Sequence, residues 1–174
     1  MRMRRSVRRA DDERSTDLDA AREAALRLLE RARRTRADLA RRLGERGYAA
    51  PTIEQALERL AGVGLVDDVE YARAFLRERL GRRSAGRRRL EQELRARGVT
   101  PADIAGAFER LAEEDPGARD EVEGARRAVA QAERRYRGLD PHLRRRRLYA
   151  LLARRGFDPD TIAAALKAPP SDGD

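Results

Sequence analysis

One sequence phrase occurs three times in this chain of 174 residues, and it constrains the fold more than any other feature. Each copy is anchored on a glycine that follows an arginine, and the copies are 51 and 58 residues apart. Self-similarity at a period of this order indicates stacked units, each too small to bury an apolar face alone. The glycines are Gly47, Gly98 and Gly156, and the apolar positions at −8, −4, +6 and +10 from them are Leu39, Leu43, Ile53 and Leu57; Leu90, Leu94, Ile104 and Phe108; and Leu148, Leu152, Ile162 and Leu166.

The spacing inside each copy predicts a helix that ends near the glycine and a second helix that begins soon after it. Apolar residues four apart share one face of a helix. Glycine adopts the left-handed conformation found just past a helix end without a Cβ penalty. Pro51, Pro101 and Pro159 follow the glycines by three or four residues, and proline is tolerated where a helix begins. We therefore expect a helix, a tight turn and a helix in each copy.

A further helix is expected before each copy, beginning at Asp17, at Asp67 or Asp68, and near Pro116. No segment alternates apolar and polar residues as a strand does, and β-branched residues are sparse. The sequence thus predicts an all-α protein of three tandem three-helix repeats, at residues 17–62, 63–114 and 115–168. Residues 1–16 are expected to form a mobile basic arm and residues 169–174 a disordered tail. The expected core faces of the first helices in repeats two and three are Tyr71, Ala74, Phe75 and Leu80, and Val122, Ala125, Val129, Ala132 and Tyr136.

The composition is strongly basic, with a net charge of +9, and every basic residue except Lys167 is an arginine. This charge favours an anionic partner, either nucleic acid or an acidic protein surface, although a solvated helix face remains the alternative. The chain has no cysteine, which excludes a disulfide framework. No apolar run approaches the roughly 18 residues of a membrane helix, and no secretory signal is recognisable. We expect a cytoplasmic protein that does not enter a membrane.

Two blocks of arginine are the best candidates for partner contacts. Residues 82–97 hold seven arginines against two glutamates, and residues 134–147 hold seven against one aspartate. Guanidinium groups suit phosphates and carboxylates. The arginines before the three repeat glycines are explained instead as cations at helix C-termini. The candidate partner-binding and DNA-binding residues are Arg82, Arg83, Arg87, Arg88, Arg135, Arg144 and Arg145.

No set of residues in the sequence suggests catalysis, a cofactor or a metal site. The single histidine, His142, stands beside a proline at an expected helix start, where a solvated side chain is the simpler interpretation. Without cysteine or a second histidine a zinc site is not expected. Asp67 and Asp68 suit a magnesium pair or helix caps, and capping explains both. We expect a protein that is not an enzyme.

The aromatic residues allow two interpretations. Tyr71 and Phe75 could stack on nucleic-acid bases, but they are four residues apart on an apolar face, which favours the core. Tyr136 and Tyr149 suit the core or its rim equally well.

Several elements of the sequence resemble the bacterial regulatory protein family RecX. The stretch from Gly64 to Ala72 resembles its "G-L-x-D-D-x-x-[FY]-A" signature. Residues 79–98 resemble its "R…G…R…E-L…[KR]-G" continuation, and residues 34–39 its "R-S-x-x-E-L" element, with Thr35 for serine and Asp38 for glutamate. Residues 155–166 resemble its C-terminal "R-G-F…I…L". The resemblance covers residues 18–167.

This resemblance implies an elongated, curved stack of the three repeats and a role in DNA repair, recombination and the SOS response. Family members modulate the recombinase RecA, usually by inhibition. They are thought to bind within the groove of the RecA filament on DNA and to block ATPase activity and strand exchange. The expected partners are therefore the RecA filament and, as an accessory and nonspecific contact, DNA. We expect a monomer.

Two other classes of function remain open. A plain DNA-binding module, such as a transcription regulator, would bind naked DNA strongly and with sequence dependence, and three-helix units superficially resemble helix-turn-helix domains. A filament regulator would bind naked DNA weakly, with steep salt dependence. A pure scaffold would be unaffected when its arginines are neutralised.

Overall fold

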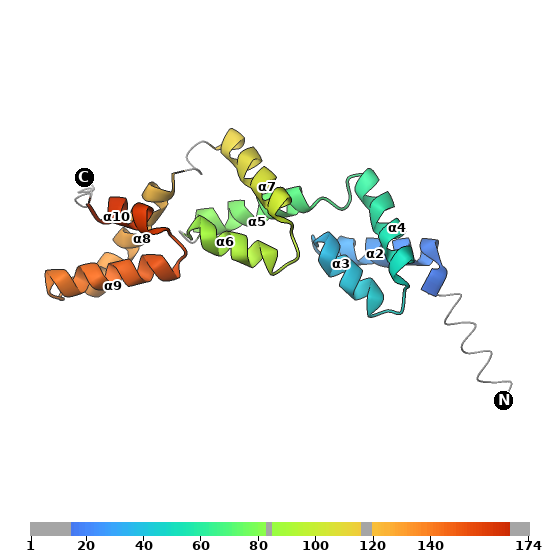
Figure 1. The fold of residues 1–174 in the computed structure, drawn as a ribbon, viewed down its shortest axis with the longest axis horizontal. Coiled ribbons are helices and arrows are strands. Elements are labelled where there is room, and N and C mark those ends of the chain that lie inside the picture. The colour runs from blue at the N-terminus through green and yellow to red at the C-terminus, as the bar shows by residue number, and fades with distance from the viewer. Residues whose placement is uncertain (1–14, 83–84, 116–119, 168–174) are drawn as a thin grey trace, which may run out of the picture. The chain divides into compact units, whose positions relative to one another are not determined.

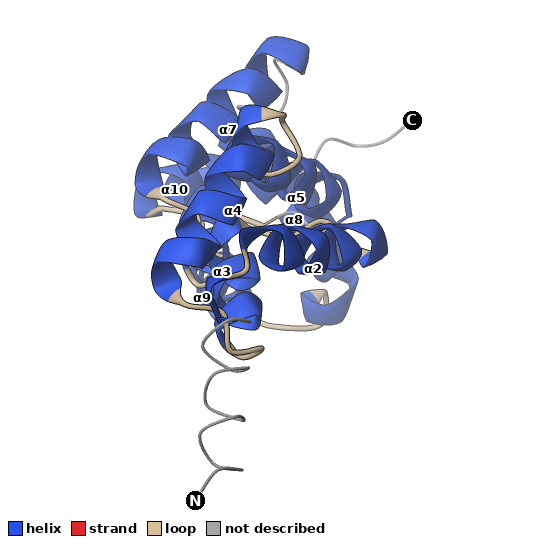
Figure 2. Cartoon of the chain, turned by 90° about the vertical axis from the view of Figure 1, so that its right-hand side faces the viewer, coloured by secondary structure: helices blue, strands red, loops and turns tan. Residues whose placement is uncertain are grey.

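The computed structural model describes residues 15–82, 85–115 and 120–167, and its regular secondary structure within these ranges is entirely helical (Figures 1 and 2). This confirms the all-α class. No helix in the described ranges is long and apolar enough to cross a membrane. The predicted tail and all but the last two residues of the predicted arm lie outside these ranges. In chain order the helices are α2 (Leu18–Arg31), α3 (Arg36–Gly44), α4 (Ala50–Gly62), α5 (Asp68–Arg82), α6 (Arg87–Arg95), α7 (Pro101–Glu114), α8 (Glu121–Tyr136), α9 (Pro141–Arg154) and α10 (Pro159–Lys167).

The three repeat glycines end helices as the sequence predicts. Gly47, Gly98 and Gly156 have φ angles of 90°, 80° and 87°, values at which a Cβ is strained. After α3 and α9 the glycine amide donates to the carbonyl three residues earlier, at 2.9 and 3.0 Å. The next amide donates to the carbonyl five residues before it, at 3.3 and 3.2 Å. These paired bonds satisfy carbonyls that a helix end otherwise leaves open.

The repeated apolar positions form the cores. Ten of the twelve are buried, and only Phe108 and Leu166 are half-buried. Alanine supplies much of the remaining buried surface, including Ala25, Ala56 and Ala125, each fully buried. Small side chains let helices approach closely, so the cores can be tightly packed although the chain has few aromatic residues.

The chain divides into two compact units, residues 1–71 with 97–100, and residues 72–96 with 101–174. In the first unit α2, α3 and α4 pack on one another around a core that includes Leu28, Leu39 and Leu57 (Figure 1). In the second unit α8, α9 and α10 enclose a separate cluster that includes Leu152, Phe157 and Ile162. The limits of the three repeats given above stay a prediction, as do the elongated, curved shape and the monomeric state.

The predicted core face of α5 is wrong. The structure buries Ala72 and Leu76, while all four predicted residues, Tyr71 and Phe75 among them, are only half-buried. The buried face is therefore rotated by one residue. The tight core accepts alanine and leucine, and the larger rings lie at its rim, where the guanidinium of Arg79 covers Phe75 at 5.1 Å from the ring centroid.

The predicted face of α8 is largely correct. Ala125 and Ala132 are buried, and Val122 and Val129 pack half-buried against the cluster of the third repeat. Tyr136 is half-buried, which places it at the rim.

Candidate protein and nucleic-acid interface

Both arginine blocks lie in the second unit, except for Arg97, which belongs to the first. The first block runs from the end of α5 through α6. The second runs from the end of α8 into α9. Since each helix has one face in a core, the positions of α6 and α9 decide which arginines reach the surface.

A close backbone contact joins the start of α6 to the end of α9. The amide of Gly86 donates to the carbonyl of Arg155 at 2.9 Å. A Cβ on Gly86 would lie 2.3 Å from the carbonyl carbon and oxygen of Gly156, closer than any side chain can fit. Gly156 therefore both ends α9 and packs closely against the start of α6.

The first unit contains an equivalent contact at the start of α3. The hydroxyl of Thr35 donates to the carbonyl of Arg97 at 2.7 Å, and a Cβ on Gly98 would lie 2.2 Å from the Cβ of Ala37. Thr35 is buried and also accepts a hydrogen bond from the amide of Asp38, which caps α3. At Gly98 and Gly156 the repeat glycine thus lies where a helix of another repeat begins, in addition to ending its own helix.

The paired aspartates cap two different helices. Asp67 accepts a hydrogen bond from the amide of Glu70 at 2.9 Å and so caps α5. Asp68 accepts from the amide of Arg36, the first residue of α3, at 2.8 Å. In the second unit, Glu121 accepts from the amide of Arg87, the first residue of α6, at 2.7 Å. Capping confirms the favoured interpretation, and the described residues contain no cluster suited to a metal ion.

The element formed by residues 34–39 is also structural. Partial burial raises the pKa of the Asp38 carboxyl, but hydrogen bonds from Arg34, Arg42 and Arg41 outweigh that effect and lower the pKa to about 2. The three arginine contacts are 2.8, 2.9 and 2.6 Å long. Arg34 also donates to the carbonyl of Leu28 at 3.2 Å, which ties the end of α2 to α3.

The first arginine block is mostly engaged within the protein. Arg87 pairs with Glu91 at 2.8 Å, and its guanidinium lies 4.3 Å from the ring centroid of Phe108. Arg88, by contrast, is exposed and makes no ion pair or hydrogen bond with a described residue. The side chain of Arg82 and all of Arg83 lie outside the described residues.

The second block divides in the same way. Arg144 pairs with Glu133 of α8 at 3.1 Å, and Arg145 donates to the carbonyl of Leu166 at 3.3 Å. Arg135 is exposed without such a partner among the described residues. Of the seven candidate arginines, Arg88 and Arg135 are thus the two that the described structure leaves available. Further exposed arginines of this kind, which the sequence analysis did not single out, include Arg134, Arg137, Arg146, Arg147 and Arg154.

The arginines before the repeat glycines have varied surroundings. Arg46 donates to the carbonyl of Arg42 at 2.9 Å, which fits the predicted role at a helix end. One guanidinium nitrogen of Arg155 is buried without a hydrogen-bond partner in the described structure. The backbone carbonyl of Arg97 accepts the hydrogen bond from Thr35 noted above.

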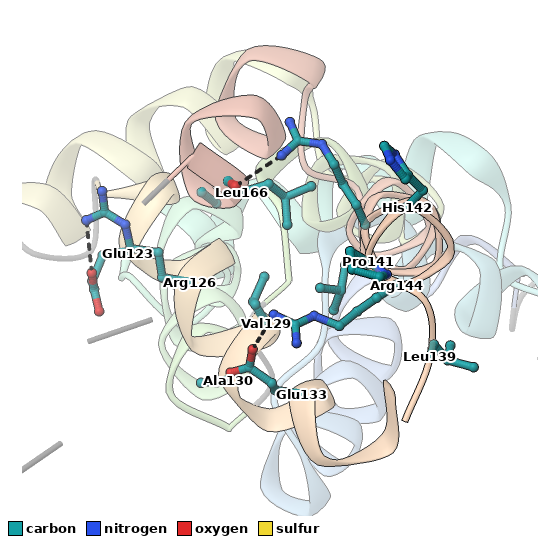
Figure 3. A pocket seen from close by; sticks show the side chains of 13 residues that line it. Glu123, Arg126, Val129, Ala130, Glu133, Leu139, Pro141, His142, Arg144 and Leu166 are labelled. Atoms are coloured by element: carbon teal, nitrogen blue, oxygen red, sulfur yellow. Dashed lines mark hydrogen bonds and ion pairs between the residues drawn. The ribbon is translucent and has the colours of Figure 1, made fainter. Parts of the chain in front are cut away.

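A groove of about 780 Å³ lies between α8, α9 and α10 (Figure 3). Its floor is apolar, and its charged rim is largely self-neutralised, with Arg144 paired to Glu133 and Arg126 to Glu123 at 3.6 Å. His142 stands exposed on this rim, and its backbone amide donates to Asp140 at 2.9 Å. The histidine lies at a capped helix start, as the solvated interpretation requires.

A second groove, of about 450 Å³, lies between α6 and α9. Arginine side chains from both helices line it, and no carboxylate does. Tyr149 lies in its wall with 45% of its surface exposed, which places this aromatic residue outside the core. This groove is electropositive, because arginines line it and none of its lining residues is acidic.

Comparisons with known proteins give one consistent result. Three family models match, each describing one three-helix domain of RecX: the first at residues 21–60, the second at 67–107 and the third at 120–166. The regulatory protein RecX of Mycobacterium sp. (strain KMS) is 42% identical over 137 residues, which is 76% of this chain and 72% of that protein. The regulatory protein RecX of Halorhodospira halophila is 39% identical over 156 residues, 88% of this chain and 91% of that protein.

Solved structures share the fold. A crystal structure of RecX from Lactobacillus salivarius matches with a TM-score of 0.77 at 19% identity, over 87% of this chain and 95% of that one. A crystal structure of a regulatory protein RecX matches with a TM-score of 0.75 at 24% identity, over 87% and 73%. Together with the matching three-helix domains and the relatives near 40% identity, these likenesses show that the chain belongs to the RecX family of regulatory proteins.

Proposed function

We propose that this protein regulates the RecA recombinase by binding its filament on DNA, and that binding inhibits the ATPase activity and strand exchange of the filament. Membership of a family of regulatory proteins carries this proposal. The net charge of +9 supports it, because a filament on DNA offers phosphates and acidic protein surface to a basic partner. A stack of repeats that contacts several filament subunits would gain avidity and hinder their turnover.

The contact surface that we propose is built on the available arginines of the second unit. Arg88 and Arg135 are its described members, and Arg82 and Arg83 extend it in the sequence. Arg87, Arg144 and Arg145 are assigned a smaller share, because each already binds a group within the protein. Exposed guanidinium groups are the side chains best suited to phosphates and carboxylates.

We further propose that the protein acts by binding alone, as a cytoplasmic monomer without enzymatic activity, cofactor or metal. The exposed position of His142 supports this view, as do the capping roles of Asp67 and Asp68. DNA is an accessory, nonspecific partner in this account.

Co-sedimentation with RecA filaments tests the proposal. Filaments are assembled on single-stranded DNA with a slowly hydrolysed ATP analogue, and naked DNA of equal concentration serves as the control. We expect the protein to pellet with filaments at concentrations that leave naked DNA largely unbound. Equal binding to both would contradict a filament regulator and favour a plain DNA-binding repeat protein.

A pair of variants tests the surface. Arg88→Ala combined with Arg135→Ala is expected to weaken filament binding about 2- to 30-fold, because an exposed ion pair contributes about 0.2–1 kcal/mol. Arg59→Ala, on the exposed face of α4, is the matched control and should bind as wild type. Undiminished binding by the double variant, with an unchanged circular-dichroism spectrum, would exclude these two arginines from the contact.

A further inference from the structure

The groove between α6 and α9 combines features that no structural role in the fold requires. Arg88, Arg89 and Gln92 line it from α6, and Tyr149 and Arg154 line it from α9. Its end is formed by the glycine turn after α9, on which α6 begins. A backbone hydrogen bond therefore joins the two helix walls, and the groove lies within the compact second unit.

The arginines of this groove differ in how far they are neutralised. Arg89 is fixed by Glu93 at 3.0 Å and lies 3.5 Å from the carbonyl of Arg154. Arg88 and Arg154 are exposed, and the guanidinium group of neither makes an ion pair or hydrogen bond with a described residue. The groove thus presents one available guanidinium on each wall, which suits a ligand carrying regularly spaced negative charges.

Tyr149 adds a surface for stacking. The residue is 45% exposed, and its hydroxyl makes no hydrogen bond with a described residue. Tyr48 provides the contrast, because it packs against the first core and its hydroxyl donates to the carbonyl of Ala20 at 3.1 Å. On α9, Arg146 precedes Tyr149 by three residues and shares its side of the helix, and Arg154 lines the same groove. An exposed aromatic ring among cations is the usual platform on which single-stranded bases stack.

We propose that the α6–α9 groove binds a single strand of nucleic acid, with phosphates at Arg88 and Arg154 and a base stacked on Tyr149. Bases in a duplex are already stacked on their neighbours and gain no stacking contact from the ring. Single strands should therefore bind more tightly than duplexes. This inference deepens the proposed function, on which it rests only for the choice of DNA as ligand. It makes the accessory DNA contact a single-strand contact with a defined aromatic residue.

An acidic protein surface is the competing occupant. It would pair with Arg88 and Arg154, but it would gain little from an exposed tyrosine ring. The two occupants therefore differ in their dependence on Tyr149.

The test is fluorescence anisotropy with a labelled oligothymidine strand, in the absence of any recombinase. Tyr149→Ala is expected to weaken binding about 5- to 150-fold, the loss typical of one stacked base, whereas Tyr149→Phe, which keeps the ring, should bind within about twofold of wild type. Leu143→Ala is the matched control, because Leu143 is a similarly exposed apolar residue of α9 outside the groove lining. On an abasic strand of equal length, wild type should lose the same factor and Tyr149→Ala should lose nothing further.

The phosphate contacts are tested by salt dependence. Combining Arg88→Ala with Arg154→Ala should lower the slope of log K against log salt by about 1.4, or about 0.7 for each phosphate. Arg59→Ala, in the first unit, should leave the slope unchanged. Wild-type binding by Tyr149→Ala, or equal affinity for duplex and single strand, would overturn the proposal, even if the arginine variant still lowered the slope. Because no recombinase is present in the anisotropy assay, a negative result there would leave the proposed filament binding untouched. Conversely, a failure to co-sediment with filaments, with strand binding through Tyr149 intact, would contradict the proposed function alone.

Discussion

Replacing Gly98 by alanine tests the close contact that recurs with the repeat. Gly98 has a φ of 80°, and a Cβ there would lie 2.2 Å from the Cβ of Ala37, with the Ala37 Cα at 3.7 Å. Gly47 is the matched position, since its φ is 90° but a Cβ there would meet nothing within 4 Å. Both glycines belong to the first unit, so the two substitutions differ mainly in the contact.

The expected magnitudes follow from this difference. The left-handed conformation costs an alanine about 1–2 kcal/mol, and Gly47→Ala should lose this much. Gly98→Ala has the same conformational cost and adds an overlap of its Cβ with the Ala37 Cβ, which costs about 1–3 kcal/mol, as overpacking generally does. Its total loss should therefore be about 2–5 kcal/mol. Ala37→Gly removes the overlapping atom at a cost of about 0.5–1 kcal/mol, so the double variant should show a favourable coupling of about 1–3 kcal/mol.

Urea unfolding followed by far-ultraviolet circular dichroism measures these free energies, and a double-mutant cycle isolates the coupling. Equal losses for Gly47→Ala and Gly98→Ala would refute the reasoning. A coupling near zero between Gly98→Ala and Ala37→Gly would do the same, because it would mean that the two positions do not touch in the folded protein.

Three further substitutions probe other parts of the fold. Leu94→Ala should cost about 2–5 kcal/mol of unfolding free energy, because it removes a fully buried side chain at a repeat position, and an unchanged melting temperature would count against the repeat alignment. Hydrogen bonds lower the pKa of Asp38 from 3.8 to about 2, so its stabilisation is present above pH 3.8 and is lost as the pH falls through 2. Asp38→Asn should therefore cost about 1 kcal/mol at neutral pH, after allowance for solvent screening. Unfolding curves at several pH values should show this difference decline as the pH falls and disappear below pH 2. Asp67→Ala and Asp68→Ala should each lower the free energy of unfolding by about 0.5–2 kcal/mol, because each removes a helix cap. Added magnesium should not change the melting temperature of the wild type. A magnesium-dependent rise would instead support a metal site.

Local signals made the helices predictable. Glycine past a helix end, proline at a helix start and aspartate before a helix act within a few residues, so the sequence alone locates them. Asp17 caps α2 through the amide of Ala20 at 2.9 Å, as expected. The face of α5 was not predictable in this way, because hydrophobicity ranks Tyr71 and Phe75 above Ala72, while the closeness of the packed helices decides which side chain fits.

The candidate site shows the same difference between contacts within one helix and contacts made by tertiary packing. Arg87 and Glu91, four residues apart on one helix, form a pair that the spacing alone could have indicated. The partners of Arg144 and Arg145 lie on other helices, and the bond from Arg145 to the Leu166 carbonyl spans 21 residues. Such partners depend on tertiary packing, so the sequence could locate the arginine blocks but could not separate the engaged arginines from the available ones.

The role of Asp68 illustrates the difference between a motif and its meaning. The sequence correctly assigned the aspartate pair to capping, yet it could not identify the amide of Arg36, 32 residues earlier, as the group that Asp68 caps. The motif therefore takes part in a contact between helices that its local sequence does not show.

The most direct measurement of the central claim is the DNA-dependent ATPase activity of the cognate RecA, titrated with this protein at fixed single-stranded DNA. A binding curve on the same naked DNA is measured in parallel. The account predicts inhibition at protein concentrations well below those that coat the DNA. Unchanged ATPase activity, or inhibition only when the DNA itself is saturated, would contradict regulation through the filament.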